Sequence, residues 1–206
     1  MWLKSESFEN GDALGEKYAM GKHDPETHAT FADNKNPHLA WGDLPAGTKS
    51  LALVMVDSQA PTVPDDVNQE GRSVPADLPR ADFFHWSVIN IDPALNEIGE
   101  GTQADGVVPT GKDDSVVIEG TRHGLNSYTQ WFEGDDEMGG DYFGYDGPFP
   151  PWNDERTHEY AFTVYALDVD VLDLPDAFDA QAVLAAIEGH VLESATINAT
   201  YRINPN

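Results

Sequence analysis

The chain has 206 residues, and a 40% hydrophobic and 10% aromatic content indicates a globular protein with one substantial core. Its 37 acidic residues outnumber 11 lysines and arginines, giving a net charge of -26. This balance excludes a basic face for nucleic acid and disfavours anionic membrane surfaces. Because the acids are spread along the chain, we favour a solvated shell suited to a salty cytoplasm, as in a halophile, over a surface for a basic partner.

The chain contains no cysteine, which excludes disulfides and thiolate chemistry. Its longest apolar runs, such as residues 51–56, are too short to span a bilayer, so no membrane insertion is expected. Residues 1–12 lack the apolar stretch of a signal peptide. We therefore expect a cytoplasmic protein folded as a single domain over residues 1–206.

The first half of the chain predicts three strands. Residues 1–8 are a short candidate, followed by a loop-rich entry to residue 30. Residues 49–56, KSLALVMV, are nearly all apolar and predict a central strand covered on both faces, with Asp57 at its end. Residues 83–91, FFHWSVINI, predict another buried strand with His85 near its start.

Loops separate these strands. Prolines break residues 62–82, which we expect to be a surface excursion. Residues 92–101 predict a turn and loop, and residues 107–109 a short extended piece. Residues 111–144 are rich in Gly and Asp but carry five aromatic residues, which either pack the loop onto the body or form a lid over a ligand.

The last third predicts two strands and one helix. A turn cluster at residues 144–151 leads into a strand at 157–167, whose β-branched and aromatic residues indicate burial. Residues 179–190 predict a helix capped by Asp179, and residues 194–203 a closing strand. Many strands and one good helix indicate a mainly β fold.

Three predicted strands each carry a polar group near one end: Asp57, His85 and His158. If adjacent strands bring these ends together, the side chains converge, either to satisfy one another in the core or to line a pocket. Two histidines and one carboxylate are also the ligand set of a metal-dependent enzyme. The remaining histidines are predicted to be surface or structural residues: His23, His28, His38, His123 and His190.

Four motifs carry a family resemblance. NPHLAWGDLPAGTKSLALVMVDSQAP, FHWSVINI, GYDGPFPP and THEYAFTVYALD occur in this order from about residue 36 to the C-terminus. The chain thereby resembles the phosphatidylethanolamine-binding protein family, in its bacterial and archaeal branch often labelled Raf-kinase-inhibitor-like. The resemblance implies an antiparallel β-sandwich with a few short helices, and here with loop excursions at 62–82 and 111–144.

The same resemblance implies a small pocket that binds a phosphoryl or other anionic ligand without catalysis, cofactor or metal. Its ligand-binding residues would be Asp57, His85, Gly147, Pro148, His158 and Tyr160. The chain departs from the family pattern at Ser58 and Gln59, where the usual residues are Pro and Asp, and at Glu159, where the usual residue is Arg. The rival interpretation is an inhibitor of kinases or proteases whose loops meet a protein partner. Exposed sheet edges would also allow a homodimer.

Overall fold

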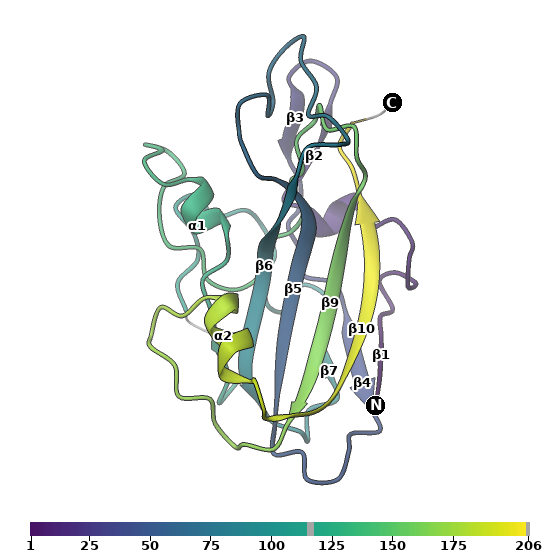
Figure 1. The fold of residues 1–206 in the computed structure, drawn as a ribbon, viewed down its shortest axis with the longest axis vertical. Helices are drawn as coiled ribbons and strands as arrows, with labels where there is room; N and C mark the ends of the chain where they lie inside the picture. The colour runs from purple at the N-terminus through teal and green to yellow at the C-terminus, as the bar shows by residue number, and fades with distance from the viewer. Residues whose placement is uncertain (115–117, 205–206) are drawn as a thin grey trace.

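The main element of the computed structural model, which describes residues 1–114 and 118–204, is a five-stranded antiparallel sheet (Figure 1). Its order is β10-β9-β5-β6-β8. The bounds are β5 (Ser50–Pro61), β6 (Arg80–Ile91), β8 (Arg122–His123), β9 (His158–Leu167) and β10 (Val191–Tyr201). The predicted strands at 49–56, 83–91 and 157–167 therefore lie side by side in its centre.

Two smaller sheets complete the fold. One has the order β1-β4-β7, and the other pairs β2 with β3. Leu3, Leu39 and Ile98 of the three-stranded sheet share one hydrophobic core with Leu53 and Phe162 of the large sheet. The bounds are β1 (Trp2–Lys4), β2 (Gly21–Asp24), β3 (His28–Phe31), β4 (Leu39–Gly42) and β7 (Glu97–Ile98). The chain thus forms a mainly β structure of packed sheets with long loops, as predicted.

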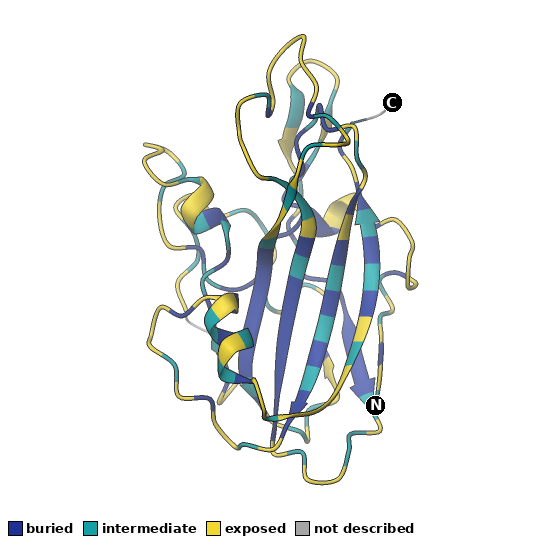
Figure 2. Ribbon diagram, in the orientation of Figure 1, coloured by how far each residue is buried: buried dark blue, intermediate teal, exposed yellow. Residues whose placement is uncertain are grey.

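The burial of β5 follows from layers on both of its faces. Residues 50–55 of β5 are all buried, whereas β9 alternates between buried and more exposed positions (Figure 2). Leu51, Leu53 and Met55 belong to the core shared between the sheets, and Val54 packs with Val183 on the opposite face. Covering both faces explains why this segment is apolar without alternation. The prediction of a doubly covered central strand is confirmed.

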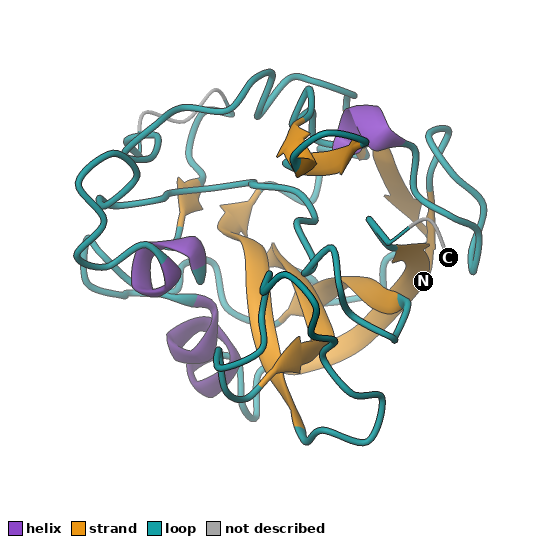
Figure 3. Ribbon diagram, turned by 90° about the horizontal axis from the view of Figure 1, so that it is seen from above, coloured by secondary structure: helices purple, strands orange, loops and turns teal. Residues whose placement is uncertain are grey.

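The helices are short and peripheral. α2 (Ala180–Ala186) begins after Asp179, whose Oδ1 accepts a hydrogen bond from the Ala182 N–H at 2.8 Å. It ends earlier than predicted, because a turn through the left-handed Gly189 leads into β10. α1 (Tyr128–Trp131) and α2 lie on the same side of the large sheet (Figure 3). A 3-10 turn spans Glu16–Tyr18. None of the helices in the described part of the chain has the length and apolarity to cross a membrane.

Several predicted boundaries were wrong. β5 and β6 remain paired beyond Asp57, with Pro61 opposite Arg80, so the predicted excursion at 62–82 shortens to 62–79. The predicted strand at 1–8 shortens to β1, the loop at 92–101 contains β7, and no strand forms at 107–109. The predicted strand at 194–203 begins instead at Val191 and ends at Tyr201. The excursion at 111–144 contains β8 and α1, and its residues 115–117 lie outside the described residues.

Candidate functional site

A cavity of about 260 Å³ lies where β5, β6 and β9 approach α1 and the loop around residue 150. Its floor is polar and its walls are largely aromatic or aliphatic. The lining residues are Asp57, Ala60, Pro61, Val67, Asn68, Ala81, Asp82, Phe83, His85, Tyr128, Trp131, Phe132, Phe149, Pro150, Pro151, His158 and Tyr160.

Strand register creates the polar floor. Asp57 in β5 lies opposite Phe83 in β6 on one side and opposite Tyr160 in β9 on the other. The rings of His85 and Tyr160 make an edge contact with centroids 5.3 Å apart. Asp57, His85, His158 and Tyr160 all line the cavity, and the first three are the strand-end groups that were predicted to converge.

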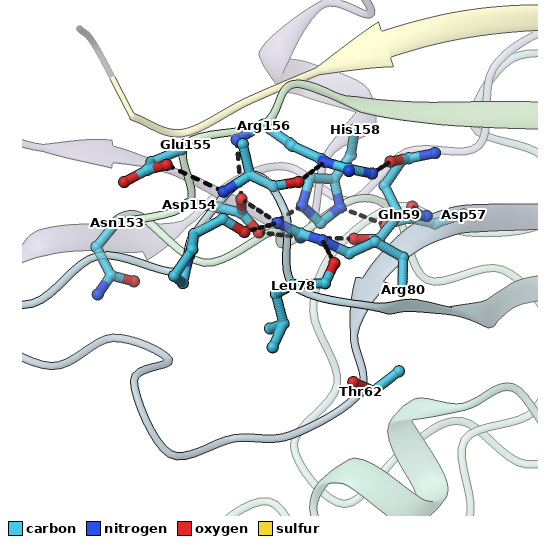
Figure 4. Close-up of polar contacts among 12 residues, drawn as sticks. Asp57, Gln59, Thr62, Leu78, Arg80, Asn153, Asp154, Glu155, Arg156 and His158 are labelled. Atoms are coloured by element: carbon cyan, nitrogen blue, oxygen red, sulfur yellow. Dashed lines mark hydrogen bonds and ion pairs between the residues drawn. The ribbon is translucent and has the colours of Figure 1, made fainter.

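Asp57 and His158 form a buried pair in this floor. His158 Nδ1 donates to Asp57 Oδ2 at 2.6 Å, and the two side chains are 1% and 5% exposed. The other ring nitrogen, Nε2, donates to Asp154 Oδ2 at 3.0 Å (Figure 4). Each ring nitrogen of His158 thus faces a carboxylate.

Arg80 adds a further charged side chain to this hydrogen-bonded series. Its Nη1 and Nη2 donate to the two oxygens of Asp154 at 2.6 and 3.0 Å (Figure 4). Burial acts to raise the pKa of Asp154, but hydrogen bonds from His158 and Arg80 outweigh it and lower the pKa to about 2. The result is an alternating series beneath the cavity, from Asp57 through His158 and Asp154 to Arg80.

The two carboxylates hold His158 as a cation. Burial alone would lower its pKa, but the hydrogen bonds to Asp154 and Asp57 dominate and raise the pKa to about 8. With both N–H groups engaged, the ring offers neither a donor to a ligand nor a lone pair to a metal. In residues 1–114 and 118–204, no three His, Asp or Glu side chains are grouped to hold a metal ion. The metal-site alternative therefore finds no geometric support.

His85 is held differently. Its Nδ1 donates to the Asp146 carbonyl at 2.8 Å, and Nε2 has no hydrogen-bond partner among the described residues. The Asp146 carboxylate below is fixed by Lys112 Nζ at 2.6 Å and by Asn34 and Asn126. Burial lowers the pKa of His85, and the nearby Asp57 carboxylate opposes this only in part. His85 is thus a neutral imidazole in an anchored orientation, with Nε2 free for a ligand.

Tyr160 supplies a second free polar group. Its hydroxyl is buried and, although the Asp57 carboxylate lies close by, it makes no hydrogen bond of ordinary length and angle with any described residue. Burial, reinforced by the Asp57 carboxylate, raises the pKa of this hydroxyl well above its ordinary value. It therefore remains a protonated donor at any physiological pH.

Gly147 and Pro148 lie behind the wall rather than in it. Neither is among the lining residues. The Gly147 N–H donates to Asn34 Oδ1 at 2.8 Å, and the Pro148 carbonyl accepts from the N–H of Met20 at 2.9 Å. The Gly147 N–H is therefore already engaged within the protein in this arrangement. The Gly147 carbonyl instead accepts from the Tyr128 hydroxyl and so supports the wall.

Sequence and fold comparisons place this geometry in a known group. The family model described as phosphatidylethanolamine-binding protein matches residues 4–202. The chain belongs to the phosphatidylethanolamine-binding protein family. It is 29% identical over 201 residues to the UPF0098 protein YbhB of Escherichia coli K12, covering 98% of this chain and 99% of that protein. A UPF0098 protein of Methanothermobacter thermautotrophicus is 30% identical over 178 residues, with 86% and 89% covered.

Solved structures agree on the fold. Escherichia coli YbcL, described as a member of the mammalian phosphatidylethanolamine-binding protein family, superimposes with a TM-score of 0.70 at 22% identity and covers 98% of both chains. A phosphatidylethanolamine-binding protein homologue of Chlamydia trachomatis gives a TM-score of 0.64 at 26% identity, covering 98% of this chain and 96% of the other. The family resemblance and the predicted fold are both confirmed.

Gln59, one of the departures from the family motifs, helps to hold Asp57 in place. The Gln59 N–H donates to Asp57 Oδ1 at 2.7 Å, and Gln59 Oε1 accepts from Arg156 Nη1 at 2.7 Å. Glu159, which replaces the usual family Arg, is exposed. Arg156, in the loop just before β9, supplies a cation next to Gln59.

Sequence reasoning missed Asp154 and Arg80. Both lie in irregular segments or at a strand end, where no periodicity marks a buried side chain. Arg80 itself was a weak signal. An arginine at the start of a largely apolar strand needs a nearby carboxylate if it is buried, and this chain is rich in carboxylates. Of the five histidines predicted to be surface or structural, none lines the cavity. His38 and His123 are buried, and burial lowers the pKa of His123 to about 4.

Proposed function

We propose that the cavity binds a small ligand through a phosphoryl or other anionic group and that it does so without catalysis. The observation that carries this proposal is the Tyr160 hydroxyl, a buried donor with no partner among the described residues. Leaving a buried polar group unsatisfied costs about 1–3 kcal/mol, which a ligand oxygen would recover. Membership of the phosphatidylethanolamine-binding protein family supports the same ligand class.

His85 is the second group that would meet the ligand. When its Nε2 is protonated, this nitrogen donates to an anionic oxygen, and the bound anion in turn favours the protonated ring. Asp57 would contribute indirectly, because its carboxylate is held by His158 and by the Gln59 N–H. The ligand oxygens would therefore lie toward Tyr160 and His85 and away from Asp57.

The charge arrangement supports binding over proton transfer. His158 lies between two carboxylates, so removing its proton would leave adjacent buried negative charges. With its pKa raised to about 8, His158 is mostly protonated at neutral pH and both of its N–H groups are engaged, so it has no lone pair with which to act as a base. The same arrangement keeps this positive charge in the floor at neutral pH and below.

Calorimetric titration with inorganic phosphate and with phosphorylethanolamine at pH 6 would test the proposal. Tyr160→Phe removes only the hydroxyl, and we expect it to weaken binding about tenfold, the effect of roughly 1.4 kcal/mol. His85→Ala should weaken binding further. Tyr165→Phe is the matched control, because Tyr165 lies on the same strand but does not line the cavity.

The affinities of these variants show whether the ligand binds in the cavity or elsewhere on the protein. Binding that is weakened in Tyr160→Phe and unchanged in Tyr165→Phe would support the proposed site. Equal affinities for the parent and both tyrosine variants, or no binding by the parent protein, would refute the proposal.

A further inference from the structure

Asp146 holds His85 at two points. Its N–H donates to the His85 carbonyl at 3.1 Å, and its own carbonyl accepts from His85 Nδ1 at 2.8 Å. Because a carbonyl can only accept, the neutral ring carries its proton on Nδ1 and keeps a lone pair on Nε2. Whatever fixes the Asp146 backbone therefore also fixes the tautomer and the orientation of His85.

The Asp146 side chain is anchored from three loops. It is 1% exposed, and Lys112 Nζ contacts its Oδ1 at 2.6 Å. Asn34 donates to the same oxygen at 2.7 Å, and Asn126 donates to Oδ2 at 2.9 Å. The two amides are neutral, whereas Lys112 brings a positive charge. A buried carboxylate without a counter-charge is strongly destabilising, so Lys112 offsets a charge that burial would make costly.

The loop that carries Lys112 is built for this contact. The Lys112 carbonyl accepts from the Phe143 N–H at 3.2 Å, which ties the loop to the segment that leads into Asp146. Gly111 has a φ of +87°, and a Cβ at this position would collide with the Asp141 carbonyl. Glycine before Lys112 therefore lets the two segments approach closely enough to bring the ammonium group to the carboxylate.

Lys112 also changes the electrostatic potential at His85. Burial lowers the pKa of His85, whereas the carboxylates of Asp57 and Asp146 act to raise it. The Lys112 ammonium group opposes the effect of Asp146, because it lies beside that carboxylate with the opposite charge. The other charged or titratable groups near the ring are Asp57 on β5, His158 and Tyr160 on β9, Tyr128 on α1 and, in the same cavity, Asp82 on β6.

We propose that Lys112 is a positioning residue of the cavity, which acts through Asp146 to hold His85 in its Nδ1–H tautomer and to keep the ring neutral in the ligand-free protein. The inference rests on the proposed function only in its consequence for binding, where a neutral His85 takes up a proton as an anion arrives. The state of the ring is measured without any ligand. Failure of anion binding therefore leaves this inference intact.

Nuclear magnetic resonance of the ligand-free protein, labelled with 15N in its histidines, reports both the tautomer and the charge of each ring. Comparison with His85→Ala identifies the signal of His85 among the seven histidines. Over about pH 8 to 5, Lys112→Met should raise the protonation constant of His85 about threefold to tenfold, because nothing then offsets the Asp146 carboxylate. Lys112→Arg should keep the parental titration. Lys49→Met is the matched control, since it removes the same charge from an exposed pair with Asp170.

Asp146→Asn separates the charge effect from a general loosening of the cavity. It keeps the backbone contacts to His85 but removes the carboxylate, so it should lower the protonation constant of His85. Loosening that admits water would raise the constant in both variants, because burial is what lowers the pKa of His85. Opposite shifts in Lys112→Met and Asp146→Asn, with an Nδ1–H ring in the parent, would support the proposal.

Any other pattern would overturn it, including an Nε2–H ring in the parent protein. If Lys112→Met does not fold, a protonation constant that is unchanged or raised in Asp146→Asn overturns the proposal by itself.

Discussion

Arg80 and Asp154 form a two-point ion pair beneath the cavity floor, with their side chains 5% and 1% exposed. The same carboxylate accepts a hydrogen bond from His158, which also donates to Asp57. Asp57, which lines the cavity, is thus linked to Arg80 through His158 and Asp154. Arg80 itself is not among the lining residues. Charges of alternating sign make the series stable, because each buried charge has an opposite neighbour.

Removing Arg80 should therefore destabilise the protein strongly. We expect Arg80→Met to lower the free energy of unfolding by about 3–5 kcal/mol, because Asp154 would lose its buried counter-charge. Urea unfolding would measure the change. Arg72→Met is the control, since the Arg72–Asp66 pair is 61% and 40% exposed and should contribute less than about 1 kcal/mol. Similar losses in the two variants would contradict a special role for the buried pair.

Stability should depend on pH through His158. The pKa of this residue is raised to about 8 in the folded protein, above the value of about 6.5 in the unfolded chain. Its stabilising contribution is therefore fully present below about pH 6.5 and is lost as the pH rises through about 8. The expected loss is about 2 kcal/mol, measured by urea unfolding across that range.

Two variants separate His158 from other titrating groups. His158→Gln should remove this decline, because the titrating group is gone. His190→Gln should keep it, since His190 forms a solvent-exposed pair with Asp168. A parent profile that stays flat from about pH 6 to 9 would mean that His158 is not held as a cation.

The Tyr160 hydroxyl should contribute nothing to folding. Because it has no partner among the described residues, Tyr160→Phe should leave the free energy of unfolding unchanged or raise it by up to about 1 kcal/mol. Tyr128→Phe provides the contrast, since the Tyr128 hydroxyl donates to the Gly147 carbonyl at 2.8 Å. That variant should lose about 1 kcal/mol. Thermal or urea unfolding of both proteins would measure the difference, and equal destabilisation would show that Tyr160 has a structural partner.

Anion affinity should rise at acid pH. Burial lowers the pKa of His85, so the free protein carries a neutral ring at neutral pH, and an anion binds best to the protonated form. Affinity for phosphorylethanolamine should therefore increase as the pH falls below about 6.5. Calorimetry from about pH 8 to 5 would show the trend in the parent and its absence in His85→Ala. An affinity that does not change over this range would exclude a role for His85 as a proton-linked donor.

The central strands could be predicted from local composition. Continuous apolar residues in 49–56 mark a strand covered on both faces, and β-branched and aromatic residues mark 83–91 and 157–167. The family motifs lie in and around these strands, which is why the polar groups at their ends, including Asp57 and His85, could be named in advance. Boundaries were less predictable, since the pairing of Pro61 with Arg80 depends on strand contacts rather than on local pattern.

The sequence by itself determined the family, the sheet-forming segments and the side chains of the cavity floor, because these depend on local pattern and ordered motifs. The tertiary structure alone decided what those side chains can do. His158 is a cation enclosed by two carboxylates because Asp57, 101 positions away, reaches it from a neighbouring strand. Arg80 meets Asp154, which lies 74 positions further along the chain. Pairings between such distant residues follow from how loops cross in space, which no local periodicity records.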